Sequence, residues 1–572
     1  MASEGESNDD DNRWTRRNLA ALWDGQPYGD TDERIKNMAE CDRIMIALYR
    51  FQTVGKVAYR RLLGMHGGGG GTSDESFRDI LTEKVNKDIE SHSGYNKEYP
   101  DNGFWPNPVP NATPTIKIEK TDPDRCFAYQ FCWHAEPEFL LWHRVIMAEF
   151  ERCLQDHDPK YDGDCSGDRY SGSDALAAPY WAWEGWDGIS LPQIISFPVY
   201  VVKTDTWKHQ GYPKGSIFPN PYHRWFAPVS IKDQKREYFP TTLAEHNTTT
   251  RSSAFTDHGA EFSYPWEQVS IPNKPSMRDV VMYALQNKNW LEFCTMKPGV
   301  GGSVWSIENA HNKFHNHVGG LTLGGIQGPG TPSINTDEEE PAEYTGTMAQ
   351  NQSIFDPLFW LHHSNVERQL CTWQKKFATD DPEPESVPSD ELMKRVLYPW
   401  TKPELLYQGK LSWNTKSSPS TNATFRDWWD HEALPYKYDE YIVAPIISDK
   451  TFTPSRPAFA KAIRMTVFFE KRLYKGGEYD LYYISKSDCK KRLVGTISVL
   501  SGQGSPCSHC ENRNYGSVDF EVSNTFETIQ DAKDAFVNDE LYLTRNDNSI
   551  KINKIDVEKW TQDLFQPDTN ID

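Results

Sequence analysis

The chain has 572 residues, of which 13% are aromatic, and its formal net charge is −21. A chain of this length can bury a sizeable core and is expected to form more than one domain. The negative charge argues against nucleic acid or an anionic membrane as a partner. No apolar run approaches the length of a membrane span.

The N-terminal sequence MASEGESNDDDNRW is polar, and ten cysteines are irregularly spaced along the chain. A secretory signal needs an apolar stretch, which this sequence lacks. Irregularly spaced cysteines in a large chain without such a signal suggest mostly reduced thiols. We therefore expect a cytoplasmic protein, and the sequence leaves open whether it forms a homo-oligomer.

A helix with one buried face is predicted at residues 139–154. Its buried positions recur at intervals of three and four: Phe139, Trp142, His143, Ile146, Phe150 and Leu154. The imidazole of His143 therefore lies among core side chains, and His134 and Cys132 precede it. Burying a polar ring without a partner costs roughly a few kcal/mol. A metal ion would supply that partner, as would an ordinary hydrogen bond.

A second helix with histidines on one face is predicted at residues 306–318, SIENAHNKFHNHV. His311 and His315 are four positions apart and so share one helical face. Glu308 and Asn312 fall on the same side. An isolated HxxxH pair is common, so metal binding stands here beside ordinary core packing as one interpretation.

The segment 355–368, FDPLFWLHHSNVER, predicts a third helix of this kind. Asp356 can cap it, with Pro357 in the first turn, where the missing N–H does no harm. The buried stripe comprises Phe359, His363, Val366, Leu370 and Trp373. This stripe favours His363 as an inward-facing ligand and leaves His362 as a neighbour that supports the ligands. The histidine clusters together indicate one buried site.

Residues 444–457 contain prolines and polar residues and predict a linker. Beyond it, short β-forming runs are separated by polar turns, which suggests a sandwich. The predicted strands are 463–469, 479–484, 493–500, 518–522 and 541–544. In the same region Cys507 and Cys510 form a CxxC pair. Such a pair can bind Cu(I); a local disulfide or two thiols without a function are the alternatives.

The histidine motifs resemble those of the type-3 copper proteins of the tyrosinase and catechol oxidase (polyphenol oxidase) family, and most closely those of the fungal tyrosinase proenzymes. The pattern H-x4-F-L-x-W-H-R-x2-M-x3-E is present at 134–151, and D-P-x-F-W-x2-H-x3-[acid] at 356–367. One departure is Glu367, where the family usually has aspartate; the longer side chain can still reach the same partners. The resemblance covers roughly residues 40–440.

The resemblance implies a mainly α fold with a four-helix-bundle dicopper core. It divides the chain into a catalytic domain (1–443), the linker (444–457) and a C-terminal β-sandwich-like domain (458–572). In the family, such a C-terminal domain covers the copper site with an aromatic side chain until a protease acts near the linker; the sequence does not indicate which aromatic would do so here. PYKYDEY, with Tyr436 and Tyr438, resembles the tyrosine motif that closes the family's core.

The family binds each copper ion through three histidines, and imidazole suits copper in both oxidation states. The expected ligands of the first copper are His66, His134 and His143. Those of the second are His311, His315 and His363. His66 is preferred to His92 because it follows a long helical pattern and matches the family's His-Gly pair, whereas His92 lies in a polar stretch.

The resemblance also assigns roles beside the ligands. A thioether bond from Cys132 to His134 is a device of the family, and a free buried cysteine is the alternative. Glu308 and Asn312 match residues thought to hold a basic water, which would deprotonate a monophenol whose unperturbed pKa is about 10. Ordinary hydrogen bonding on the helix face is the alternative for this pair.

Three further roles follow from the same resemblance. Asn316 is expected near the mouth of the site, where it would tune substrate choice. Asp356 and His362 are expected to hold the ligand helix and its imidazole in place. Related fungal proenzymes use a CxxC pair in copper loading, which would give Cys507 and Cys510 that role.

The implied function is that of a tyrosinase, which uses dioxygen to hydroxylate monophenols and to oxidise o-diphenols to o-quinones, feeding melanin formation. Its expected partners are dioxygen, phenolic or catecholic small molecules and an activating protease. A catechol oxidase or o-aminophenol oxidase, without the hydroxylation step, is the nearest alternative. A haemocyanin-like oxygen carrier is disfavoured because neither a signal nor a sequence repeat is visible. A metal hydrolase would need HExxH, and Asn312 stands where its glutamate would be.

Overall fold

The fold is that of a computed structural model of the chain. The described residues are 12–26, 31–55, 58–59, 62–63, 66, 132, 134, 136–161, 170, 172–185, 192–225, 249, 251, 277–296, 301–303, 305–319, 347–349, 353–378, 384–407, 422–442, 462–473, 477–484, 490–499, 515–522, 525–537, 541–545 and 548–560. The expected linker 444–457, His92, Cys507 and Cys510 lie outside these ranges, and what the sequence predicts for them stays a prediction.

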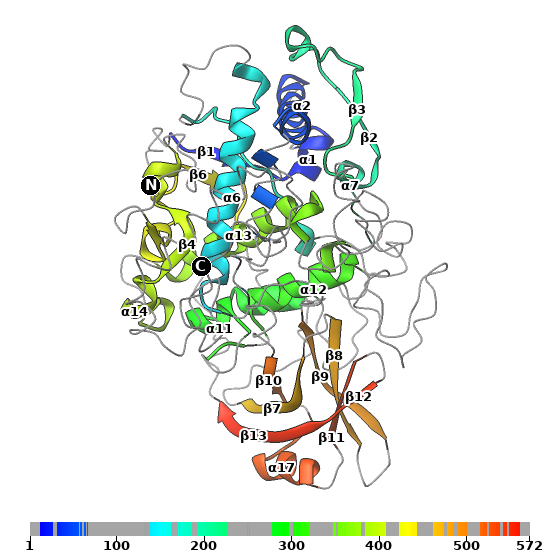
Figure 1. Cartoon of the computed structure of the whole chain (residues 1–572), viewed down its shortest axis with the longest axis vertical. Helices are drawn as coiled ribbons and strands as arrows, with labels where there is room; N and C mark the ends of the chain where they lie inside the picture. The colour runs from blue at the N-terminus through cyan, green and yellow to red at the C-terminus, as the bar shows by residue number, and fades with distance from the viewer. Residues whose placement is uncertain are drawn as a thin grey trace, which may run out of the picture.

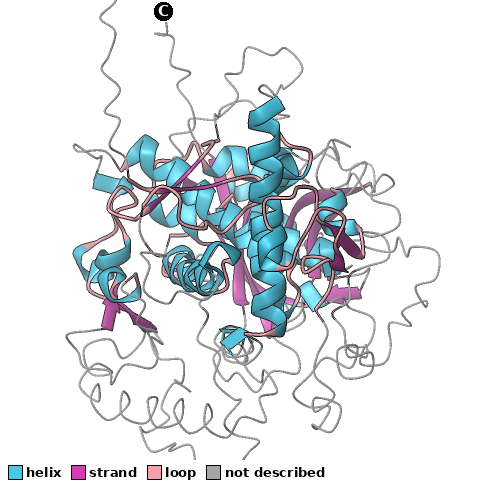
Figure 2. Cartoon of the chain, turned by 90° about the horizontal axis from the view of Figure 1, so that it is seen from above, coloured by secondary structure: helices cyan, strands magenta, loops and turns pink. Residues whose placement is uncertain are grey.

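In the part of the chain that the structure describes, four long helices lie above the C-terminal strands of Figure 1. They are α2 (Thr31–Thr53), α6 (Phe139–Asp156), α12 (Ile307–Gly319) and α13 (Leu358–Phe377). Helix α6 packs against α2 and α13, and α12 packs against α13. Seen from above, helices are the commonest regular elements of the described chain, with strands visible between and behind them (Figure 2). The predicted mainly α core is thus confirmed.

Shorter elements surround the long helices. The short helices are α1 (Leu19–Trp23), α7 (Gln193–Ser196), α10 (Met277–Ala284), α11 (Trp290–Cys294), α14 (Asp390–Met393) and α15 (Pro403–Leu406). Three two-stranded sheets pair β1 (Trp14–Arg16) with β6 (Tyr436–Tyr438), β2 (Val199–Val201) with β3 (Ile217–Pro219), and β4 (Val396–Thr401) with β5 (Asn422–Thr424). Within the described ranges no helix is both long and apolar enough to cross a membrane.

Two antiparallel sheets follow at the lower end of Figure 1. Their strands are β7 (Ala462–Leu473), β8 (Gly477–Ile484), β9 (Lys491–Val499), β10 (Tyr515–Glu521), β11 (Leu541–Arg545), β12 (Asn548–Ile550) and β13 (Ile552–Trp560). One sheet has the order β10-β7-β13 and the other β12-β11-β8-β9, and helix α17 (Ile529–Val537) packs on β13. All five predicted strands are present, whereas β12, β13 and α17 were not predicted.

Candidate metal centre

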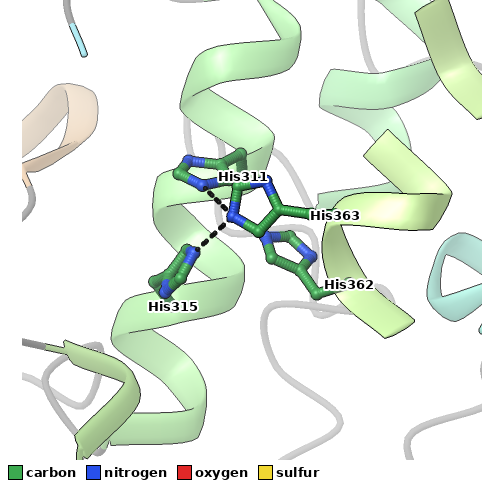
Figure 3. A group of neighbouring side chains, drawn as sticks. All are labelled: His311, His315, His362 and His363. Atoms are coloured by element: carbon green, nitrogen blue, oxygen red, sulfur yellow. Dashed lines mark hydrogen bonds between the residues drawn. The ribbon is translucent and has the colours of Figure 1, made fainter. Parts of the chain in front are cut away.

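Four histidines of two helices converge at one buried point (Figure 3). His311 and His315 come from α12, and His362 and His363 from α13, with one ring nitrogen of each within 4.8 Å of the others. The Nε2 atom of His363 lies 3.2 Å from that of His311 and 3.4 Å from that of His315. This helix pair therefore brings together the three imidazoles that the sequence motifs single out here.

A second group of histidines overlaps the first. His66, His143 and His363 place ring nitrogens within 4.8 Å of one another. The ring of His134 lies 5.7 Å from that of His66 and 5.2 Å from that of His143, centre to centre. The structure thus gathers all six expected ligands around one buried space, and His363 belongs to both groups.

Hydrogen bonds orient three of these rings. Backbone carbonyls lie 2.8 Å from Nδ1 of His143, at Phe139, and 2.8 Å from Nδ1 of His315, at Met348. Nδ1 of His311 is 2.9 Å from the side-chain oxygen of Asn312. An oxygen acceptor at Nδ1 keeps the ring proton there and leaves the Nε2 lone pair for a metal.

The electrostatics of the site favour neutral imidazoles. Burial lowers the pKa of His143 to about 3 and that of His315 to about 4, because a charged ring loses its hydration. Several buried ring nitrogens also have no hydrogen-bond partner among the described residues, including both of His66 and Nε2 of His143. Buried neutral imidazoles with uncommitted lone pairs fit copper ions.

His362, predicted only to support the ligands, has a ring nitrogen within 4.8 Å of those of His311, His315 and His363. Its ring stacks on Phe314 with centroids 4.0 Å apart and planes 4° apart, and Trp183 lies 5.6 Å away. Both its ring nitrogens are buried without a hydrogen-bond partner in the described part of the chain. Its position is compatible with support of the neighbouring ligands and equally with donation to a metal.

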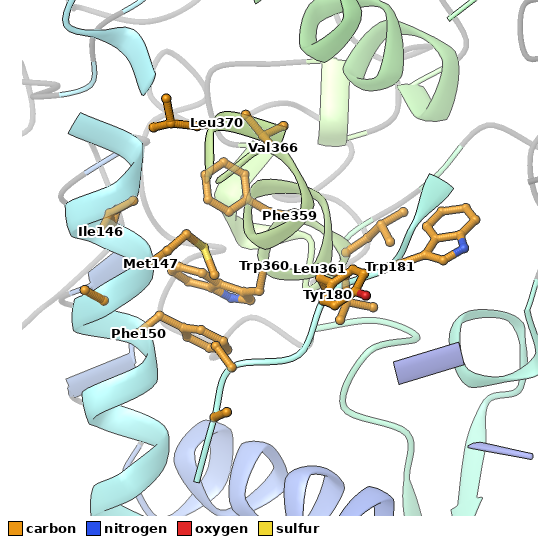
Figure 4. Close-up of a cluster of buried hydrophobic side chains, with 14 of the residues drawn as sticks. Ile146, Met147, Phe150, Tyr180, Trp181, Phe359, Trp360, Leu361, Val366 and Leu370 are labelled. Carbon is orange, nitrogen blue, oxygen red and sulfur yellow. The ribbon is translucent and has the colours of Figure 1, made fainter. Parts of the chain in front are cut away.

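Helix α13 is held against α6 by large apolar side chains (Figure 4). Phe150 and Trp360 stack with centroids 4.0 Å apart and planes 3° apart. The ring of Phe359 lies 3.9 Å from that of His363 and 4.7 Å from that of His66. Phe150 of the predicted α6 stripe thus meets Trp360, which lies outside the stripe predicted for α13, whereas Phe359 of that stripe forms an apolar wall of the site.

Buried ion pairs join the same two helices just beyond the ligands. Glu367, one turn after His363, accepts a hydrogen bond from Nε of Arg144 at 3.1 Å. Arg16 of β1 bonds both Glu367 and Glu151 of α6. Glu367 thus reaches the arginine next to His143. No local sequence pattern pointed to Arg16, because its partners lie far away along the chain.

The start of α13 is held by Asp356. Its side chain accepts from the backbone N–H of Leu358 at 3.0 Å and pairs with Arg251 at 2.6 Å. The helix begins at Leu358, with Pro357 directly before it. The cap position is thus Pro357 and not Asp356 as predicted, and Asp356 holds the helix start from one residue earlier, with a partner, Arg251, that the sequence did not reveal.

Glu308 and Asn312 are fully buried on α12, and both contact the same residue. An oxygen of Glu308 accepts from the hydroxyl of Thr295 at 2.8 Å and from the backbone N–H of Met296 at 3.0 Å. The amide nitrogen of Asn312 lies 3.2 Å from the sulfur of Met296 and 3.3 Å from the carbonyl oxygen of Ser498. Sequence reasoning missed Thr295, Met296 and Ser498, which follow no helical spacing.

Cys132 and Asn316 are both buried near the histidines in sequence, and their expected roles stay predictions. Cys132 is a buried free cysteine two positions before His134, so the thioether stays a prediction. Asn316 is fully buried on α12. A role at the mouth of the site likewise stays a prediction.

Comparisons with known proteins also indicate a copper protein of the tyrosinase and haemocyanin kind. The family model described as the common central domain of tyrosinase matches residues 91–376, which is half of the chain. A tyrosinase of Podospora anserina is 28% identical over 276 residues, 45% of this chain and 42% of that protein. Hemocyanin 1 of Megathura crenulata is 24% identical over 416 residues, 70% of this chain and 9% of that protein. The chain thus spans less than half the length of these two relatives.

Solved structures of the same two kinds share the fold. A pro-tyrosinase variant from Aspergillus oryzae superposes with a TM-score of 0.54 at 15% identity, covering 97% of this chain and 93% of that one. A deoxygenated haemocyanin from Rapana thomasiana gives 0.51 at 16% identity, covering 96% and 99%. Such low identities show a shared architecture and leave the activity to be argued from the site.

Proposed function

Because the chain belongs to the tyrosinase family of type-3 copper proteins, we propose that it is a dioxygen-dependent oxidase of phenols. The proposed activity is that of a tyrosinase, which hydroxylates monophenols and oxidises o-diphenols to o-quinones. The observation that carries this proposal is the convergence of buried imidazoles in two groups that share His363.

The histidines would hold two copper ions. The first would be bound by His66, His134 and His143, and the second by His311, His315 and His363. The copper pair, when bound, supplies the binding and reduction of dioxygen. The protein keeps the imidazoles neutral by burial, orients three of them through acceptors at Nδ1, and keeps water from one side with Phe359.

The hydroxylation step makes a further demand on the protein. A monophenol has an unperturbed pKa of about 10 and must lose its proton to bind a metal well. Glu308 and Asn312 would hold a water that accepts this proton. Their burial on α12 beside His311 supports this assignment.

We further propose that the protein is made as a latent proenzyme and activated by a protease. The packing of β9 against α12, the helix that carries His311 and His315, supports a C-terminal domain that limits access to the site. A thioether at Cys132, copper loading through Cys507 and Cys510, substrate tuning by Asn316 and a cytoplasmic location belong to the same proposal.

Two related functions compete with it. A catechol oxidase or o-aminophenol oxidase would use the same histidines without the deprotonating step. An oxygen carrier would bind dioxygen without turnover, and the long match to Hemocyanin 1, over 70% of this chain, keeps that function in view.

Oxygen uptake separates these functions. Copper-loaded protein is given L-tyrosine and then L-DOPA, before and after limited proteolysis. Uptake with both substrates after cleavage is the expected result. Uptake with L-DOPA alone would make the protein a catechol oxidase, and reversible oxygen binding without uptake would make it a carrier.

A further inference from the structure

Met296 belongs to two parts of the molecule at once. It follows α11 in the catalytic region, yet its side chain, 1% exposed, belongs to the hydrophobic cluster of the C-terminal sheets, which also contains Met465, Leu481 and Ile497. All other members of that cluster come from residues 463–557. Met296 is therefore an anchor of the catalytic region inside the C-terminal domain.

A second contact lies beside this anchor, at Ser498 of β9. The backbone N–H of Ser498 donates to the side-chain oxygen of Asn309 at 3.4 Å, and its carbonyl accepts from the amide of Asn312 at 3.3 Å. The two asparagines are one turn apart on α12, so they share a helical face. Since β9 is the last strand of its sheet in the described chain, α12 covers the edge of that sheet.

Both contacts lead directly to the metal centre. The backbone N–H of Met296 donates to Glu308, and its sulfur lies beside the amide of Asn312. The oxygen of that same amide faces Nδ1 of His311 at 2.9 Å. A displacement of the C-terminal sheets would move Met296, and with it the direct contacts to Glu308 and to Asn312, which holds His311.

We propose that Met296, Asn309 and Asn312 form a docking contact through which the C-terminal domain sets the state of the copper site. In the docked form, Met296 and Ser498 engage Glu308 and the Asn312 amide, which are then withheld from a site water. Release of the domain frees both groups. This inference rests on the proposed phenol oxidase function and makes Met296 and Asn309 positioning residues that act through Glu308, Asn312 and His311.

Hydrogen exchange of the full-length chain tests the docking itself without any turnover. Met296→Ala removes the anchor, Asn309→Ala removes the acceptor of the Ser498 backbone N–H, and Met296→Leu is the matched control that keeps the buried volume. We expect exchange in residues 491–499 to become at least tenfold faster in the first two variants and to stay within about twofold of wild type in the third. Unchanged exchange in both alanine variants would overturn the inference. Equally raised exchange in residues 462–473 would also overturn it, because the whole domain would then have been destabilised.

The coupling to the site is tested by comparing two substrates. In uncleaved, copper-loaded Met296→Ala we expect the ratio of oxygen uptake with L-tyrosine to that with L-DOPA to rise at least threefold, and Met296→Leu to restore the wild-type ratio. Equal increases with both substrates would show that the domain only covers the site. If the wild type consumes no oxygen in any form while the exchange pattern holds, the proposed function fails and the docking contact stands.

Discussion

The two histidine groups of the metal centre are built in different ways. In the second group, His311 and His315 occupy successive turns of α12, and His363 meets them from α13. In the first group, His143 lies on α6 and His134 shortly before that helix, whereas His66 comes from a distant segment of the chain. A ligand pair on one helix is encoded by local spacing, whereas ligands from separate segments are brought together only by packing of the whole core.

The difference extends to what holds each ring in place. Protein acceptors orient His311 and His315 at Nδ1, and His143 likewise. Both ring nitrogens of His66, in contrast, lack a hydrogen-bond partner among the described residues. A metal ion would therefore contribute more to the order of His66 than to that of His143, His311 or His315. The predictions that follow compare the groups directly.

The largest effect is expected when one copper ligand is removed from either group. His363→Ala removes one of the three donors proposed for the second copper, and His66→Ala one of the three proposed for the first, so each purified protein should retain about one ion per chain, because the other three donors stay in place. Metal analysis of the full-length variants measures this, with exposed His209→Ala as a control that keeps two ions. Almost no copper in His363→Ala beside one ion per chain in His66→Ala would show that both copper ions depend on His363.

The next effect concerns the ion pairs that join the helices of the two groups. Glu367→Ala leaves Arg16 and Arg144 buried without this carboxylate, and we expect the free energy of unfolding to fall by about 3–5 kcal/mol. Asp390→Ala, which breaks the exposed pair with Arg426, should cost less than about 1 kcal/mol. Urea denaturation of both variants gives the values. A small cost for Glu367→Ala would mean that apolar packing alone joins the helices.

A smaller effect compares one histidine from each group in the copper-free protein. Burial lowers the pKa of His143 to about 3 and that of His315 to about 4, below the value of about 6.5 expected in the unfolded chain. Below pH 6.5 the unfolded chain therefore binds protons that the folded chain does not. The free energy of unfolding is therefore highest above pH 6.5 and decreases as the pH falls. The decrease due to His143 ends near pH 3, and that due to His315 ends near pH 4.

Each of these rings should cost about 2 kcal/mol of folding stability between pH 6.5 and pH 5. We expect His143→Gln and His315→Gln each to reduce the loss of stability over this interval by that amount, as measured by urea denaturation of the metal-free variants. The two variants should behave alike down to about pH 5 and differ only below about pH 4. An unchanged loss in either variant would show that the ring is charged inside the folded protein.

The contrast between the groups also explains how far the sequence could predict the site. The spacing of His311 and His315, and the buried stripe that contains His363, are local patterns, and the structure places all three side by side. The first group required the family resemblance, because nothing in the spacing links His66 to His143. Arg16, Arg251, Thr295 and Met296 were not found, since their partners lie at unrelated positions along the chain.

The same reasoning applies to the fold. The five predicted C-terminal strands have runs of β-forming residues. Strand β13 was missed although Ile555 and Val557 alternate with charged residues, the pattern of a half-buried strand. It is stabilised by pairing along β7, a contact between distant segments that no local pattern expresses.

The smallest effect concerns the number of donors in the second group. His362 stacks on Phe314, and its ring nitrogens share the buried space with those of His311, His315 and His363, so this group could hold four imidazoles against three in the first. As a supporting residue, His362 only restricts the ring of its neighbour, and His362→Gln should weaken copper binding about tenfold while both ions are retained at saturation. Titration of the metal-free variant with Cu(I) in competition with a chelator measures this affinity, and Phe314→Leu, which removes the stacking partner but no nitrogen, should show a similar loss. If His362→Gln instead binds only one ion at saturation while Phe314→Leu binds two, His362 is itself a ligand, and the two groups differ in donor number as well as in construction.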